Sequence, residues 1–256
     1  MYDDANSLEA IARKDYSVDI GGFLSRGWEI FTQNPLGFIG FCILTVVISF
    51  VLSYIPFIGT IANIVISYVL PAGYYIVAFK ISRGQLSEFG DFFKGFQNTY
   101  FLPVFLATLV VSIFVGVLCL PFLVGAVLSF YGIFQQMAAQ SGDPSLPDLS
   151  IPGALTGALL VLGLILLIPA IYLGIAYTFS IPLIVDRKAD FWSAMETSRK
   201  LITRHWFPFF GFSIVLGLIN FAGVLACGVG ALFTIPLTIC AIAAAYENII
   251  GLTPES

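Results

Sequence analysis

Residues 186–210 have the sequence DRKADFWSAMETSRKLITRHWFPFF, and this stretch decides how the chain is expected to fold. It contains five of the eleven Lys and Arg residues, the only His and two of the three Trp. Long uncharged runs precede and follow it. Basic and aromatic residues placed between apolar runs are typical of a helix that lies on a membrane surface. The stretch therefore predicts a basic surface helix between two hydrophobic hairpins.

The composition of the whole chain also indicates a membrane protein. Hydrophobic residues make up 59% of the 256 residues and charged residues only 10%, whereas a soluble domain contains about 25% charged residues. Too little polar surface remains for water, so the bilayer is the expected solvent. We expect no nucleic acid partner, because the chain has no basic domain that could neutralise phosphates.

The uncharged runs predict an all-α integral membrane fold with six transmembrane helices as three hairpins, each preceded by an amphipathic interfacial helix. Residues 125–140 are predicted to extend the third helix or to lie on the far surface. A seventh span within 120–140 is the alternative, and it would place the basic cluster on the other side. The predicted spanning helices cover residues 36–55, 58–79, 102–124, 153–185, 208–226 and 231–250.

The chain also indicates three copies of one unit, at 20–80, 88–186 and 190–251, within a single membrane domain over 20–251. General membrane sequence preferences are the alternative to a true repeat. The matching prolines at the starts of spanning helices are Pro35, Pro103 and Pro208. Nine residues before them stand the cations Arg26, Lys94 and Arg199, and seven before them Trp28, Phe96 and Leu201. The prolines expected to kink the return helices are Pro71, Pro169 and Pro236, and Pro182 is a further expected kink.

The distribution of positive charge predicts the orientation. Every Lys and Arg lies in the N-terminal segment, in 80–94 or in 187–204. By the positive-inside rule these segments are cytoplasmic. We therefore expect a multi-pass protein of the plasma membrane, of the bacterial inner membrane type, with both termini in the cytoplasm. Residues 1–19 are the predicted cytoplasmic tail, without a signal-peptide core, and 252–256 a C-terminal tail.

The surface helices supply the candidate contact residues. Their aromatic side chains can enter the acyl boundary while Lys and Arg meet anionic headgroups, each cation contributing on the order of 1 kcal/mol. Ordinary interfacial anchoring is the alternative to binding a specific headgroup or a partner subunit. The candidates are Arg26, Trp28, Lys94, Phe96, Trp192, Arg199, Lys200, Arg204 and Trp206. In the third surface helix Asp190 is the predicted N-cap. Its predicted apolar face contains Phe191, Trp192, Met195, Ile202 and Trp206.

The sequence predicts no catalytic, cofactor or metal site. It contains no nucleotide-binding loop, zinc-protease motif or nucleophile elbow. His205 has no neighbouring nucleophile or carboxylate in sequence, and Glu247 is expected at the interface or paired with a cation of a surface helix. An interfacial lipid enzyme would need polar groups to converge near one of these two residues.

A few other residues inside the apolar runs can be assigned structural roles. Asn63 and Asn220 are the strongest intrahelical polar candidates and are expected to bond between helices. Gly153 and Gly157 form a GxxxG pattern that predicts a packing contact. The cysteines lack metal-binding spacing and are expected to be small buried hydrophobes, although a pairing between two of them stays open. They are Cys42, Cys119, Cys227 and Cys240.

Three patterns resemble a known group of proteins. They are VDRKADFWSAMETSRKLITRHWF at 185–207, GW followed by six residues and Pro35, and the Phe-rich segment 89–101. The chain resembles, over roughly residues 20–250, a group of uncharacterised bacterial multi-pass proteins. That group includes the membrane domain of some glycerophosphoryl diester phosphodiesterases. The catalytic domain is absent here, so the resemblance implies a membrane module without phosphodiesterase activity.

Together these features predict a non-catalytic membrane protein, an accessory subunit or lipid-associated scaffold that uses basic and aromatic surface helices. The expected partners are membrane lipids with anionic headgroups or other membrane subunits. The alternative is a small-molecule or lipid transporter, with Pro-kinked helices around a polar cavity.

Overall fold

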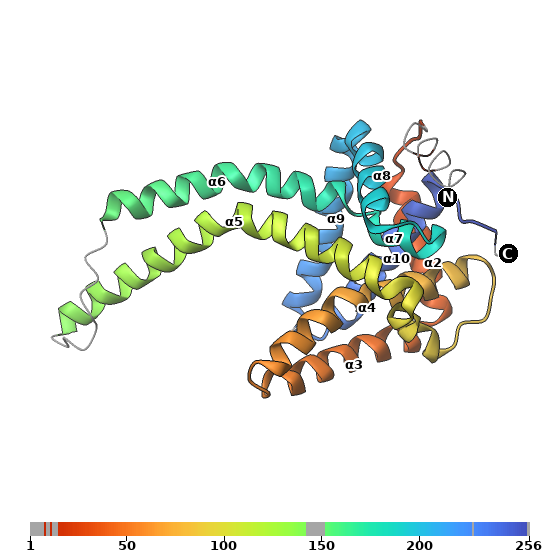
Figure 1. Ribbon diagram of the computed structural model, residues 1–256, viewed down its shortest axis with the longest axis horizontal. Helices are drawn as coiled ribbons and strands as arrows, with labels where there is room; N and C mark the ends of the chain where they lie inside the picture. The colour runs from red at the N-terminus through yellow and green to blue at the C-terminus, as the bar shows by residue number, and fades with distance from the viewer. Residues whose placement is uncertain (1–7, 9–10, 12–14, 142–151, 227, 255–256) are drawn as a thin grey trace. The chain divides into compact units, whose positions relative to one another are not determined.

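The computed structural model describes residues 8, 11, 15–141, 152–226 and 228–254 (Figure 1). It is 85% helical, has no strand among these residues, and contains six helices long and apolar enough to cross a membrane. The protein is therefore an all-α, multi-pass membrane protein, which confirms the predicted fold class. The chain forms two compact units: unit 1 comprises Met1–Leu109 and Ile175–Ser256, and unit 2 comprises Val110–Gly174.

A surface helix is followed by a spanning helix three times along the chain, and each time a single residue separates the two. This residue is Asn34, Gln97 or His205. The helices that precede it are α2 (Ile20–Gln33), η1 (Phe89–Phe96) and α8 (Phe191–Arg204). The helices that follow it are α3 (Pro35–Ser53), α5 (Asn98–Ser141) and α9 (Trp206–Leu225). The second surface element differs from the other two, because η1 is a 3-10 helix.

The return arms of the three hairpins end alike. They are α4 (Ile58–Ser82), α6 (Gly153–Ala176) with α7 (Ser180–Arg187), and α10 (Ala231–Ile249). Each arm is followed within two residues by a residue of positive φ, namely Gly84, Lys188 and Gly251. A residue in this left-handed region ends a helix by turning the chain away from its axis. The expected prolines Pro71, Pro169 and Pro236 all lie inside their helices.

Helix α5 continues to Ser141, so residues 125–140 extend the third spanning helix, which is one of the two predicted arrangements, and form no separate span. One proline behaves differently from the prediction. At Pro182 the structure has a helix break in place of a kink: residues 177–179 separate α6 from α7. Pro182 then lies in the first turn of α7, where its missing N–H removes no helical hydrogen bond.

Aromatic rings fill the core of unit 1. Tyr246 of α10 has no exposed surface, and its ring centroid lies 5.2 Å from that of Phe79 and 5.8 Å from that of Phe179. Nearby, Phe41 of α3 stacks on Phe92 of η1 at 4.7 Å. Such ring pairs contribute about 0.5–1.5 kcal/mol beyond the area they bury. The first cluster joins the three return arms, and the second holds η1 on the first hairpin.

Two glycines allow backbones to approach closely within unit 1. A Cβ on Gly27 of α2 would lie 2.6 Å from the backbone of Ala241 in α10. A Cβ on Gly73 of α4 would overlap the carbonyl oxygen of Phe92 in η1. Small residues are what allow membrane helices to pack at such short range.

Unit 2 is an antiparallel pair of helices made by the second part of α5 and most of α6. Gly125 faces Leu160, with 3.0 Å from a built Cβ to the Leu160 nitrogen, and Gly163 faces Phe122 at 2.5 Å. The predicted packing contact through Gly153 and Gly157 is wrong, because no described atom lies within 4 Å of a Cβ at either glycine. The close contact uses Gly125 and Gly163 instead.

We expect Gly73→Ala to lower the free energy of unfolding by about 1–3 kcal/mol, because the new methyl group must displace the Phe92 backbone. Thermal unfolding in detergent, followed by tryptophan fluorescence, measures this change. The matched control is Gly217→Ala in α9, whose Cβ meets no described atom within 4 Å. Equal melting temperatures for the two variants would refute the contact between η1 and α4.

Candidate functional site at the polar end of unit 1

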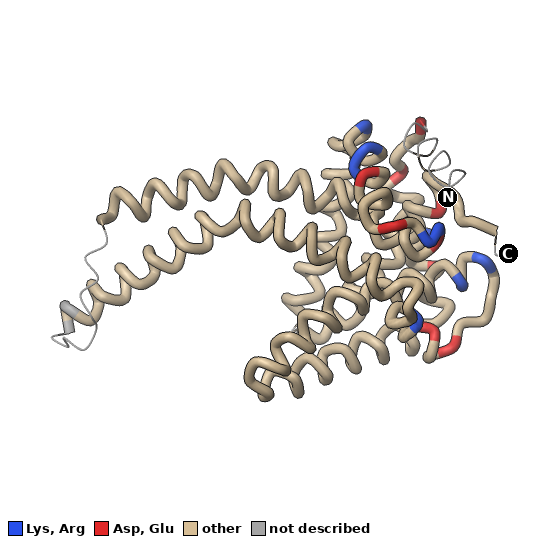
Figure 2. The backbone as a smooth tube through the Cα atoms, in the orientation of Figure 1, with Lys and Arg blue, Asp and Glu red and all other residues tan. Residues whose placement is uncertain are grey.

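The charged residues of unit 1 gather at one end of its helices, which we call the polar end (Figure 2). Arg26 and Arg187 both lie there, beside the carboxylates of Glu247 and Asp186. Helices α2, η1, α7 and α8 lie at this end, together with the last turns of α4 and α10. Its described ionisable side chains include Arg26, Lys80, Arg83, Asp91, Lys94, Asp186, Arg187, Glu196, Arg199, Lys200, Arg204 and Glu247.

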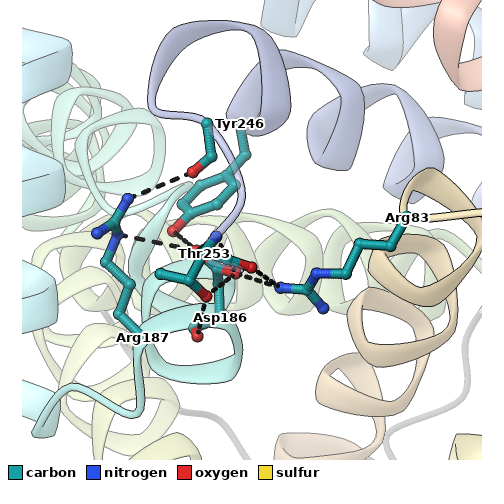
Figure 3. A network of polar contacts seen from close by, with 6 residues as sticks. Arg83, Asp186, Arg187, Tyr246 and Thr253 are labelled. Carbon is teal, nitrogen blue, oxygen red and sulfur yellow. Dashed lines mark hydrogen bonds and ion pairs between the residues drawn. The ribbon is translucent and has the colours of Figure 1, made fainter. Parts of the chain in front are cut away.

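The carboxylate of Asp186 lies at the centre of the polar end with no exposed surface (Figure 3). It accepts hydrogen bonds from Arg83 Nη2 at 2.7 Å and from the Tyr246 hydroxyl at 2.9 Å. The Thr253 hydroxyl and backbone N–H also donate to it, at 2.8 and 3.1 Å. Arg187 lies 3.8 Å away and donates to the carbonyl of Gly251 at 3.3 Å.

This network joins four parts of the chain that are far apart in sequence: α4, α7, α10 and the segment that follows α10. A buried charge is stable only when it is paired and hydrogen-bonded, because its desolvation costs several kcal/mol. Asp186 meets both conditions. The role that we assign to Asp186 is therefore to hold the ends of the three return arms together.

Asp91 forms a second buried cluster, between η1 and α4. Its carboxylate lies 2.8 Å from Lys80 Nζ and 2.7 Å from Lys94 Nζ, and it accepts from the Glu88 backbone N–H at 2.9 Å. Burial opposes ionisation of Asp91, but the hydrogen bonds from the two lysines outweigh it and lower its pKa from 3.8 to about 2. The carboxylate therefore stays charged at neutral pH and fastens η1 to the end of α4.

Glu247 of α10 forms a third cluster. It lies 3.3 Å from Arg26 Nη2 of α2 and accepts from the Ser82 hydroxyl at 2.8 Å. Arg26 also pairs with Glu29 at 3.0 Å. Of the two expectations for Glu247, the structure shows the pairing with a cation of a surface helix.

Helix α8 is fixed at its start and along its inner face. Asp190 is its N-cap, as predicted, and accepts from the backbone N–H groups of Trp192 and Ser193, both at 3.1 Å. On the inner face the fully buried Ser198 bridges the break between α6 and α7. Its hydroxyl donates to the Ala176 carbonyl at 2.7 Å and accepts from the Phe179 N–H at 3.1 Å.

The outer face of α8 and its flanks combine positive charge with large aromatic rings. Within the predicted apolar face, Met195 and Ile202 are buried in the protein, whereas Trp192 is 58% exposed. Lys200 is 51% exposed and lies 3.4 Å from Glu196. Near the two ends of α8, Lys188 precedes the helix, Arg204 is its last residue and Phe207 lies in the first turn of α9, and all three are exposed. We call Lys188, Trp192, Lys200, Arg204 and Phe207 the outer face of α8.

The other sequence candidates have different surroundings. The three cations at the repeated position are all paired with carboxylates: Arg26 with Glu247, Lys94 with Asp91, and Arg199 with Glu196. Trp28 is 56% exposed, and Phe96 is half-buried. Trp206 is half-buried and stacks on Phe210 at 5.0 Å.

The two polar candidates inside the spans form different hydrogen bonds. Asn220 Nδ2 donates to the Thr238 hydroxyl at 3.3 Å, which is the expected bond between helices. Asn63 accepts from Ser67 of its own helix at 3.5 Å. Cys42, Cys119 and Cys240 are free thiols, and Cys227 lies outside the described residues. No group of three or more potential metal ligands occurs in the described part of the chain.

The N-terminal segment reaches the junction between α8 and α9, a contact that was not predicted from the sequence. Asp15 Oδ1 lies 3.2 Å from His205 Nε2, so this His does have a carboxylate neighbour. The Tyr16 hydroxyl donates to the Leu201 carbonyl at 2.8 Å. Burial raises the pKa of Tyr16 in spite of the lowering effect of Arg204, so this hydroxyl remains a donor.

Asp186→Asn is expected to lower the free energy of unfolding by about 3 kcal/mol, because Arg83 and Arg187 lose their buried counter-charge. Chemical unfolding in mixed micelles measures the loss. The control is Glu29→Gln, which breaks an exposed ion pair and should cost less than about 1 kcal/mol. A loss for Asp186→Asn as small as that of the control would contradict the assigned role of Asp186.

The lowered pKa of Asp91 predicts an acid-dependent loss of stability. Because the folded state holds the pKa below its ordinary value of 3.8, the contribution is complete above about pH 4 and is lost as the pH falls towards about 2. The Asp91→Asn variant should not show this loss in the free energy of unfolding, which is on the order of 2 kcal/mol. Unfolding measured at a series of pH values tests it, and parallel curves for wild type and variant would contradict it.

Comparison with known proteins places the chain in a family. No curated protein and no solved structure matches it. A family model described as a protein of unknown function, DUF975, matches residues 30–253, which include all six spans and the Asp186, Asp91 and outer-face residues described above. The chain therefore belongs to the DUF975 family of proteins of unknown function.

Proposed function

We propose that the protein is a non-catalytic membrane module, a lipid-associated scaffold or accessory subunit, that holds anionic lipid headgroups at the outer face of α8. The observation that carries this proposal is the pairing of exposed cations with exposed aromatic rings on a helix whose other face is buried. Lys200 and Trp192 are each more than half exposed, at 51% and 58%. Cations of this kind attract anionic headgroups, and the rings enter the acyl boundary.

The geometry favours α8 over the other two surface helices. In α2 the cation Arg26 is shared between Glu29 and Glu247. In η1, Lys94 lies 2.7 Å from a buried carboxylate. These ion pairs occupy the cations in holding the fold. On the outer face of α8, Lys188 and Arg204 are exposed, and Phe207 is 81% exposed. The headgroup contact is therefore assigned to α8, and the other sequence candidates are left to anchoring and internal pairing.

This proposal includes an orientation. The positive-inside rule places the polar end, with the segments around Tyr16 and Thr253, in the cytoplasm. The outer face of α8 then meets the cytoplasmic leaflet, where anionic lipids attract basic segments. The resemblance to the membrane domain of glycerophosphoryl diester phosphodiesterases agrees with a membrane module and stays a prediction.

A small-molecule or lipid transporter is the second candidate. It is favoured by two buried polar atoms in the third hairpin, Asn220 Oδ1 and Thr234 Oγ1, which have no hydrogen-bond partner among the described residues. Buried polar atoms in a membrane helix usually have a hydrogen-bond partner. These two atoms are therefore suited to bond to a polar group of a transported molecule. They lie on one hairpin only, and so the first proposal is preferred.

Lys200→Ala is expected to lower the affinity for phosphatidylglycerol about fivefold, because one cation near an anionic surface contributes on the order of 1 kcal/mol. Native mass spectrometry of protein released from nanodiscs measures retained lipid. The nanodiscs contain phosphatidylcholine with a minor fraction of phosphatidylglycerol.

The matched control is Lys94→Ala, which removes the same charge from a lysine 2.7 Å from the buried carboxylate of Asp91, whereas Lys200 lies 3.4 Å from the more exposed carboxylate of Glu196. It should change lipid retention little. Equal losses in the two variants would show a general charge effect, and no retained phosphatidylglycerol in the wild type would refute the headgroup contact at α8.

A further inference from the structure

A short part of the N-terminal segment lies against the end of α8. The Tyr16 hydroxyl bonds to the carbonyl of Leu201, and the Asp15 carboxylate lies 3.2 Å from His205. Leu8 and Ile11 are buried, with 7% and 9% of their surfaces exposed. We call Leu8, Ile11, Asp15 and Tyr16 the N-terminal strap.

Ring contacts hold the N-terminal strap in place. The ring of Tyr16 meets that of His205 edge-on at 4.5 Å and that of Phe209 at 6.1 Å. The strap therefore covers the single-residue junction between α8 and α9. Because the Asp15 side chain is 96% exposed, its ion pair is weak, and the Tyr16 hydroxyl makes the stronger of these two polar contacts.

Asp15 places a negative charge beside His205, at the C-terminal end of the helix to which the proposed function assigns the headgroup. The C-terminal end of α8 has Arg204 as its last residue and His205 as its C-cap. Both can donate to an anion, and the oxygens of a carboxylate and of a phosphate accept the same charge-assisted hydrogen bonds. Asp15 and a lipid phosphate are therefore alternatives at this end of the helix.

We propose that the N-terminal strap is an autoinhibitory contact. While the strap is docked, Asp15 and Tyr16 shield the His205 end of α8 from anionic headgroups. When the strap leaves, this end becomes available to them. The inference rests on the proposed function of α8 and adds the regulation of that same site.

The double variant Asp15→Asn with Tyr16→Phe tests the proposal, because it removes the charge and the hydroxyl while keeping the ring. Hydrogen exchange of the strap amides should quicken roughly two- to tenfold, as expected for loss of one buried hydrogen bond. Retention of phosphatidylglycerol from the same nanodiscs should rise by a similar factor, since apparent affinity follows the fraction of the open form.

The control is Glu29→Gln, which removes an exposed carboxylate of the polar end but leaves the strap contacts intact. It should alter neither strap exchange nor lipid retention. The proposal is overturned if strap exchange does not change, if exchange quickens without a gain in lipid, or if the control gains as much lipid.

Failure of the strap is distinguishable from failure of the proposed function. Suppose that Lys200→Ala retains less phosphatidylglycerol than the wild type, but the double variant retains the same amount. This result overturns the strap proposal alone. If the Lys200→Ala variant retains as much phosphatidylglycerol as the wild type, the headgroup contact itself is overturned.

Discussion

Burial of one ionised carboxylate constrains the polar end of unit 1. Asp186 has no exposed surface, and its oxygens bond to Arg83, Tyr246 and Thr253. Removing any of these partners would leave a charge in a place with little water to solvate it. The ends of α4, α7 and α10 are therefore held in one register. The aromatic cluster around Tyr246 lies directly against this network and fills the space between the same three arms.

The cations of the polar end fall into two groups that differ in what they contact. Arg26, Lys80, Arg83 and Lys94 pair with carboxylates of other elements or of their own, and they fasten the surface elements to the return arms. The cations on the outer face of α8 project from a helix that Asp190 and Ser198 already hold firmly. A helix that is already held by its cap and its inner face is suited to an external contact.

Features that depend on local sequence could be predicted. Uncharged runs mark the six spans, and Asp190 is a cap because its side chain reaches N–H groups two and three residues later. Long-range partners could not be predicted: Arg83 and Asp186 are 103 positions apart. The sequence also could not separate Trp192, which is exposed, from Met195 and Ile202, which are buried in the protein, because an apolar residue suits lipid and protein interior equally. The close approach of η1 to Gly73 also joins segments whose pairing no local pattern encodes.

The one-residue junctions at Asn34, Gln97 and His205 have a mechanical consequence. A single residue offers only two soft torsions, so a surface helix and the span that follows it cannot reorient independently. The direction in which each span leaves its junction is therefore tied to the direction of the surface helix before it.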